Sequence, residues 1–149
     1  MNPLALAWNF RPRFTALVVK VQASTSGFIT GIRFYKNIDN TGAHIGSLWS
    51  ATGQLLASGT FTGESASGWQ ELDFTSPVAV TAGTTYVASY LTSTGHYAIT
   101  AQGLASAVTN GPLTAQAAGG VFAYGSASTF PTDSYNASNY WVDVVYSQS

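Results

Sequence analysis

Residues 68–75 read GWQELDFT and alternate between two kinds of side chain. One side of an extended chain would carry Gln70, Leu72 and Phe74, and the other side would carry Trp69, Glu71 and Asp73. Successive side chains of a β-strand point to opposite faces of the sheet. The stretch therefore predicts a strand with one face toward a core and one toward solvent.

The same period of two recurs along most of the chain. Further strands are expected at residues 14–23, 28–36, 45–50, 54–62, 78–80, 84–92, 96–100, 121–124 and 139–147. Turns that contain Gly, Ser, Asn or Pro separate these segments at a spacing of about 8–12 residues. We therefore predict an all-β fold, an antiparallel β-sandwich or jelly roll of about 8–10 strands.

Three details of this pattern can be checked against a structure. Within 28–36, the alternation places Ile29 on the side of Arg33 and Tyr35, opposite Phe34. Residues 101–120 lack a clear period and predict a long irregular insert. The tryptophans that fall within expected strands are predicted to pack in the core rather than to stack on a ligand; they are Trp49, Trp69 and Trp141.

Composition limits the class of protein. The 149 residues, 15.6 kDa, suffice for one domain. Only 7% of residues are charged and the net charge is −1, so the chain has no basic field for phosphates and no nucleic-acid partner is expected. No apolar run approaches the roughly 18 residues of a membrane span, and no membrane partner is expected. The first residues lack a signal peptide's basic start, which predicts a chain that stays in the cytosol after synthesis.

The residues available for catalysis are few. There are two His and six carboxylates, without Cys and without a G-x-S-x-G motif. Glu71 and Asp73 share a strand face, which we interpret as solvated rather than as a glycosidase pair. We expect no enzyme activity, no catalytic or metal-binding residues and no cofactor. A structural calcium ion is conceivable only in the loop 37–42, where Asx–Gly turn chemistry explains the oxygen-rich sequence equally well.

Aromatic side chains mixed with amides and hydroxyls indicate a binding surface. Residues 130–141 combine Phe, Tyr and Trp with Asn, Asp and Ser. Flat rings beside amide groups suit sugars, which have an apolar face and a polar edge. The candidate glycan-binding residues are Tyr135, Tyr140, Trp141, Tyr97 and His96. Packing of these rings at the ends of the sandwich is an equally good interpretation.

The N-terminal residues precede the sandwich and are treated separately. Residues 1–13 form a predicted arm, and residues 14–149 form the single β-sandwich domain. The arm contains Trp8, Phe10, Arg11 and Arg13. It is interpreted either as an extra edge strand or as a docking arm that binds a neighbouring protein.

Several motifs resemble a family of bacterial domains of unknown function. They are TGIRFYK at 30–36, GSLW at 46–49, PVAVTAGTTYVASY at 77–90 and NYWVDV at 139–144. Members of that family are usually accessory modules in secreted multidomain proteins. The resemblance implies an accessory β-sandwich, with adhesion or glycan binding as its expected role, and it supplies no catalytic residues.

A stand-alone module without a signal peptide leads to a specific hypothesis. Bacteriophage particles assemble in the cytosol and are released by lysis, so we expect a non-enzymatic virion surface protein, either a capsid decoration or a tail-surface protein. Its partners would be other virion proteins or copies of itself, with a host cell-surface glycan as a further ligand. The alternative is an extracellular or cell-surface module that binds carbohydrate or mediates adhesion for a bacterial secreted protein.

Overall fold

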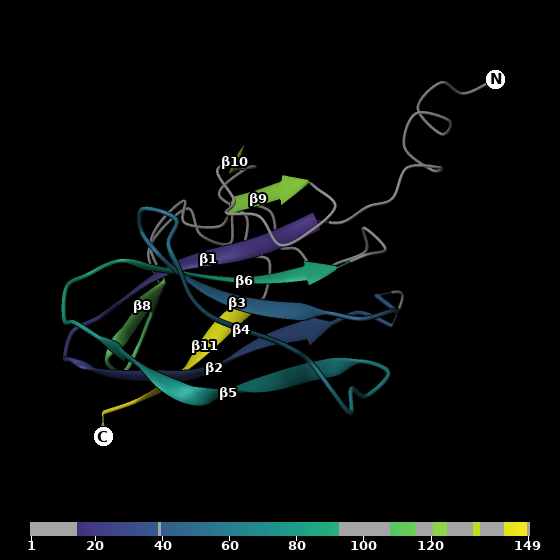
Figure 1. The fold of residues 1–149 in the computed structure, drawn as a ribbon, viewed down its shortest axis with the longest axis horizontal. Helices are drawn as coiled ribbons and strands as arrows, with labels where there is room; N and C mark the ends of the chain where they lie inside the picture. The colour runs from purple at the N-terminus through teal and green to yellow at the C-terminus, as the bar shows by residue number, and fades with distance from the viewer. Residues whose placement is uncertain are drawn as a thin grey trace.

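A computed structural model describes residues 15–38, 40–92, 108–115, 121–124, 133–134 and 142–148. Within these ranges the chain forms strands and no helix (Figure 1). The strands are β1 Thr15–Ala23, β2 Gly27–Lys36, β3 Ile45–Ser50, β4 Leu55–Thr60, β5 Gly68–Val80, β6 Tyr86–Thr92, β7 Val108–Asn110, β8 Leu113–Ala115, β9 Val121–Tyr124, β10 Asp133–Ser134 and β11 Val142–Ser147.

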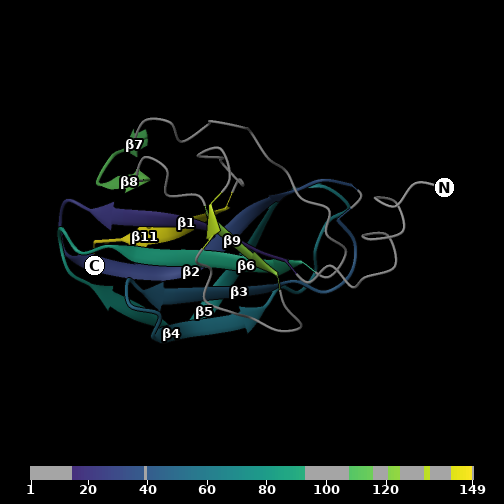
Figure 2. The same cartoon turned by 90° about the horizontal axis from the view of Figure 1, so that it is seen from above.

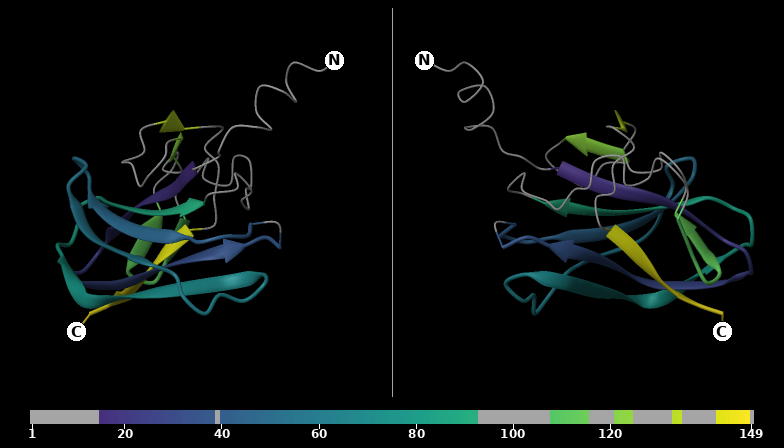
Figure 3. Two further views of the ribbon diagram at one scale, coloured as in Figure 1. Left: turned by 45° about the vertical axis from the view of Figure 1, so that its right-hand side comes forward. Right: turned by 180° about the vertical axis from the view of Figure 1, so that it is seen from behind.

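The strands form two antiparallel sheets. The larger sheet has eight strands, in the order β10-β9-β1-β6-β3-β4, and the hairpin of β7 and β8 joins it through β8 and β1. The smaller sheet has three strands, in the order β11-β2-β5 (Figures 1 and 3). Seen from above, the two sheets lie one over the other (Figure 2). This arrangement confirms the predicted all-β sandwich.

The core lies between the inward faces of the two sheets. From the larger sheet it receives Leu17, Leu48 and Tyr90, and from the smaller sheet Ile32 and Phe34, all of them fully buried. Phe34 and Tyr90 stack with 4.1 Å between their ring centroids and 13° between their planes, which joins the two layers. Burial of each such side chain contributes about 1.5–3 kcal/mol.

The tryptophan predictions had different outcomes. Trp49 is buried in a second cluster with Val18 and Val87, and its Nε1 donates to Ser89 Oγ at 2.9 Å. Its predicted packing is confirmed. Trp69 is 50% exposed, so its predicted core position is wrong. Trp141 lies outside the described residues.

A β-bulge corrects the predicted faces of β2. Ile29 pairs with Val78 and Gly31 pairs with Asp73, so the register between β2 and β5 shifts at this point. The shift turns Ile29 into the core, where it is 1% exposed, although strict alternation places it with Arg33. The segments expected as separate strands at 68–75 and 78–80 form one continuous strand across this bulge, β5.

The predicted irregular insert contains a short hairpin. Strands β7 and β8 pair through a turn at Gly111 and Pro112, and Gly111 has the positive φ of 60° that favours glycine. The carbonyl of Pro112 accepts a hydrogen bond from the Ser24 backbone N–H at 2.8 Å, which ties the turn to the end of β1. The strand expected at 96–100 lies outside the described residues.

Candidate functional site

Two aromatic side chains project together from the outer face of the smaller sheet. Tyr35 on β2 lies directly opposite Trp69 on β5, with their ring centroids 5.7 Å apart and their planes at 88°. The side chains are 41% and 50% exposed, respectively. Edge-to-face pairs of this kind are favourable, because the positive edge of one ring meets the negative face of the other. A cross-strand pair therefore fixes the orientation of both rings at the surface.

Charged side chains surround this aromatic pair. The Arg33 guanidinium lies over Trp69, 5.3 Å from the ring centroid, and pairs with Asp143 of β11 at 3.3 Å. On β5, Glu71 lies opposite Arg33, and Asp73 follows on the same side of the strand. We call this surface the aromatic–acidic face; its residues are Arg33, Tyr35, Trp69, Glu71, Asp73 and Asp143.

The two carboxyl groups on β5 share a hydrogen bond. This side-chain hydrogen bond with Asp73 raises the pKa of Glu71 above its ordinary value. Partial burial and the negative charge of Asp73 act in the same direction, and the positive charge of Arg33 opposes them. Glu71 therefore loses its proton at a higher pH than an isolated Glu does. This exposed pair agrees with the predicted solvated strand face.

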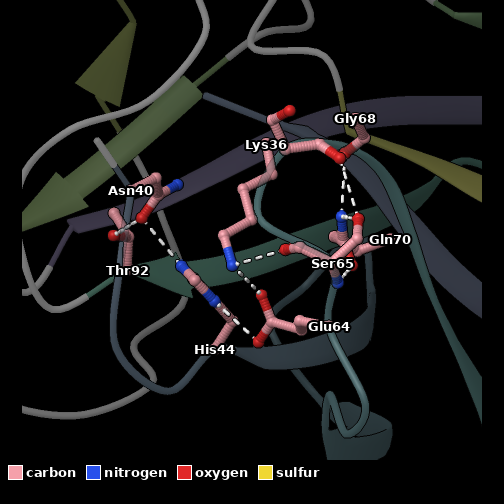
Figure 4. A network of polar contacts seen from close by, with 9 residues as sticks. Lys36, Asn40, His44, Glu64, Ser65, Gly68, Gln70 and Thr92 are labelled. Carbon is pink, nitrogen blue, oxygen red and sulfur yellow. Dashed lines mark hydrogen bonds and ion pairs between the residues drawn. The ribbon is translucent and has the colours of Figure 1, made fainter. Parts of the chain in front are cut away.

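A buried polar network lies where β2 ends and β5 begins (Figure 4). Lys36 Nζ contacts Glu64 Oε1 and donates to the Ser65 carbonyl, both at 3.0 Å. Gln70 accepts from the Ser65 backbone N–H at 2.9 Å and donates to Ser65 Oγ and to the Gly68 carbonyl. These contacts tie the loop after β4 to the strand ends that carry Tyr35 and Trp69.

The network continues inward through a histidine. Glu64 Oε2 lies 2.9 Å from His44 Nδ1, and His44 Nε2 donates to Asn40 Oδ1 at 2.7 Å. Thr92 Oγ1 donates to the same oxygen. His44, Asn40 and Thr92 are fully buried, and the His44 ring lies 4.9 Å from the Phe34 ring. A buried polar network whose groups are satisfied makes the surrounding structure more rigid.

Comparison with known proteins identifies the family. A model described as a domain of unknown function (DUF4082) matches residues 9–142. The chain belongs to the DUF4082 family. The match confirms the resemblance to a family of domains of unknown function. No curated protein and no solved structure has significant similarity to the chain.

The candidate residues predicted from the sequence lie elsewhere in this DUF4082 domain. The glycan candidates Tyr135, Tyr140, Trp141, Tyr97 and His96 all lie outside the described residues, and so do the arm residues Trp8, Phe10, Arg11 and Arg13. Both groups remain predictions. The family match begins at residue 9, within the segment predicted as an arm.

Sequence reasoning missed the aromatic–acidic face, although a signal for it existed. Trp69 alternates in step with Glu71 and Asp73, and Tyr35 alternates in step with Arg33. An aromatic residue that shares a strand face with charged residues points to solvent. The alternation of Trp69 with its charged neighbours therefore argues against core packing. No local pattern indicated the buried network, because Asn40 and Thr92 are 52 residues apart in the sequence.

In the loop 37–42, which was considered as a calcium site, the side-chain amide of Asn40 points into the protein. Asn40 Oδ1 accepts from His44 and Thr92, so this oxygen is directed into the protein. Asp39 lies outside the described residues. Across the part of the DUF4082 domain that the structure describes, no three His, Asp or Glu side chains gather as a metal site would require. The same part contains no helix long and apolar enough to span a membrane.

Proposed function

We propose that this DUF4082 domain is a non-catalytic module that binds carbohydrate on its aromatic–acidic face. The observation that carries the proposal is the exposed cross-strand pair of Tyr35 and Trp69, bordered by Arg33. An exposed pair of rings on a regular sheet contributes little to the core. Its exposure therefore favours a role in binding.

The chemistry of the face suits a sugar. The apolar face of a pyranose ring would lie against Trp69 or Tyr35, where C–H groups contact the aromatic surface. Its hydroxyl groups would then reach the Arg33 guanidinium, which donates, and the carboxylates of Asp143 and Glu71, which accept. Alternating donors and acceptors around an apolar platform match the hydroxyl pattern of a sugar edge.

The buried network supports this proposal because it holds the strand ends that carry Tyr35 and Trp69 in place before a ligand binds. Lys36 and Gln70 adjoin Tyr35 and Trp69 in the sequence, and their side chains anchor the loop before β5 from the inner side of the sheet. A binding surface that is rigid before the ligand arrives loses less conformational entropy on binding.

The experiment is a screen of immobilised polysaccharides and glycan arrays with the full chain. Trp69→Ala and Tyr35→Ala should each reduce retention at least tenfold. Leu55→Ala is the matched control, because Leu55 is also 50% exposed but lies on β4, in the other sheet. Retention of no glycan would overturn the proposal. Loss of binding in Tyr135→Ala or Tyr97→Ala, with Trp69→Ala unaffected, would move the site to the segments favoured by the sequence.

The location of the protein is a separate proposal. We propose that the protein lies on a virion surface, with virion proteins or further copies of the chain as partners. Its attachment there would be made by the arm at residues 1–13. Deletion of this arm should then abolish attachment to the particle. A glycan-binding face would serve equally in the alternative setting, a module of a bacterial secreted or cell-surface protein.

A further inference from the structure

The deepest part of the buried network brings a hydroxyl group against a carboxamide. Thr92 Oγ1, at the end of β6, lies 2.5 Å from Asn40 Oδ1, in the loop between β2 and β3. This distance is at the short end of the range for O–H···O hydrogen bonds. Both residues have 0% exposure. A nucleophilic atom and an acyl group are therefore held in contact in a site that excludes bulk water.

The carbonyl of this carboxamide is also polarised. His44 Nε2 donates to Asn40 Oδ1 at 2.7 Å, and Glu64 lies 2.9 Å from the other ring nitrogen. Both ring nitrogens of His44 therefore lie within hydrogen-bond distance of side-chain oxygen atoms. If a nucleophile added to the Asn40 Cγ, negative charge would develop on Oδ1, where the His44 donor already lies.

The nitrogen of the same carboxamide has no hydrogen-bond partner among the described residues. Asn40 Nδ2 is buried, and an unpaired buried N–H group costs about 1–3 kcal/mol. Asn40 thus has an activated carbonyl oxygen and an amino group that no described residue holds in place. In an acyl transfer, that amino group is the leaving group.

We infer that Thr92 and Asn40 form an intramolecular ester bond in the folded protein. Thr92 Oγ1 attacks Asn40 Cγ, a new Oγ1–Cγ bond forms, the Cγ–Nδ2 bond breaks, and ammonia leaves. The hydroxyl proton is transferred to the departing nitrogen, and the N–H of His44 Nε2 stabilises the negative charge that develops on Asn40 Oδ1. Glu64 acts as a positioning residue that orients the His44 ring.

The bond would serve as a cross-link in a chain that has no cysteine. It would join the loop after β2 to β6 and therefore connect the two sheets covalently. A cross-link stabilises a fold chiefly by limiting the unfolded chain, as a disulfide does. Burial of the bond would also protect it from hydrolysis.

Intact-mass spectrometry of the purified full chain is the first test. The ester predicts a mass lower than that of the sequence by one ammonia, about 17 Da. Thr92→Val and Asn40→Ala should keep their full sequence masses, whereas Thr92→Ser, which retains a hydroxyl, should still lose ammonia. A folded native protein with the full sequence mass would overturn the inference.

Digestion after glutamate locates the bond. The only Glu residues are Glu64 and Glu71, so complete cleavage of the denatured protein separates residues 1–64 from residues 72–149. With the ester, these two fragments stay joined on a denaturing gel and separate after treatment with hydroxylamine. A succinimide, for example at Asn110-Gly111, also loses ammonia but joins no fragments. Loss of ammonia with separated fragments would therefore count against the ester.

The roles of the neighbouring side chains are tested by rate. In protein sampled at intervals after a short pulse of expression, His44→Phe should block the mass change. Glu64→Gln should slow it at least tenfold while leaving the final product unchanged. Equal rates of ester formation in the native chain and in Glu64→Gln would show that Glu64 has no role in the reaction.

Discussion

Lys36 and Glu64 form an ion pair with 3.0 Å between Nζ and Oε1, and their side chains are 9% and 12% exposed. Only 7% of the residues in this chain are charged, yet one positive and one negative side chain are placed in its interior. Glu64 also contacts His44, so a single carboxylate connects the strand ends that carry the aromatic pair with the site of the inferred ester.

Lys36→Met should lower the free energy of unfolding by about 3–5 kcal/mol, because it removes the cation that faces Glu64 Oε1 in the interior and leaves this carboxylate only its contact with His44. Urea denaturation followed by tryptophan fluorescence measures the change. The double variant Lys36→Met/Glu64→Gln should be more stable than the single variant, since it removes both charges. A single variant within 1 kcal/mol of the native protein would show that the pair carries little energy.

Gly31→Ala should destabilise the fold by about 1–3 kcal/mol or more. A Cβ at this position would overlap the backbone carbonyl oxygen of Leu72, which cannot move without disturbing β5. Gly46→Ala is the comparison, because its Cβ would meet the side chains of Leu72 and Phe61 at 3.0 Å, and side chains can adjust. Thermal denaturation should rank Gly31→Ala as the less stable of the two, and the reverse order would contradict the predicted contact.

Glu71 should make a small, pH-dependent contribution to stability. Its pKa is raised in the folded state by Asp73, so the folded protein holds this proton more tightly than the unfolded chain does. Stability from this group is therefore present at low pH and is lost as the pH rises through the folded-state pKa. Carboxyl NMR titration should show Glu71 titrating above an ordinary Glu. The Asp73→Asn variant should bring it closer to the ordinary value, and an unchanged titration would exclude Asp73 as the cause.

Arg33→Gln should weaken glycan binding while leaving the stability of the fold nearly unchanged. The Arg33 and Asp143 side chains are 43% and 40% exposed, so their ion pair should be worth less than about 1 kcal/mol. The variant should therefore keep nearly the native melting temperature. Calorimetric titration with a glycan from the screen should nevertheless show a several-fold weaker affinity, because the donor beside Trp69 is lost. Unchanged affinity would place Arg33 outside the binding site.

The fold was largely predictable because β-strand periodicity is a local property. The strict alternation of residues 68–75 predicts a strand, and β5 includes it. The position of Ile29 was not predictable, because a bulge that depends on pairing between β2 and β5 reverses its side. The hairpin of β7 and β8 was missed because three-residue strands have too few residues for a period.

The candidate site was less predictable than the fold. The position of Trp69 within an expected strand favours core packing, although its alternation with charged neighbours indicates a side chain that points to solvent. His44, Asn40 and Thr92 carry no motif, and only the folded chain brings them together. Chemistry that arises from contacts between distant segments has no signature in a single sequence.

The pairing of β2 sets an order of assembly. Trp69 on its partner β5 is 34 residues from Tyr35 (69 − 35), whereas Asp143 on its other partner, β11, is 110 residues from Arg33. During synthesis, Tyr35 and Trp69 can therefore meet while β11 is still inside the ribosome, and the edge of β2 stays open until β11 emerges. Until β11 has been synthesised, the nascent chain exposes an unpaired strand edge, which is a template for pairing with other chains.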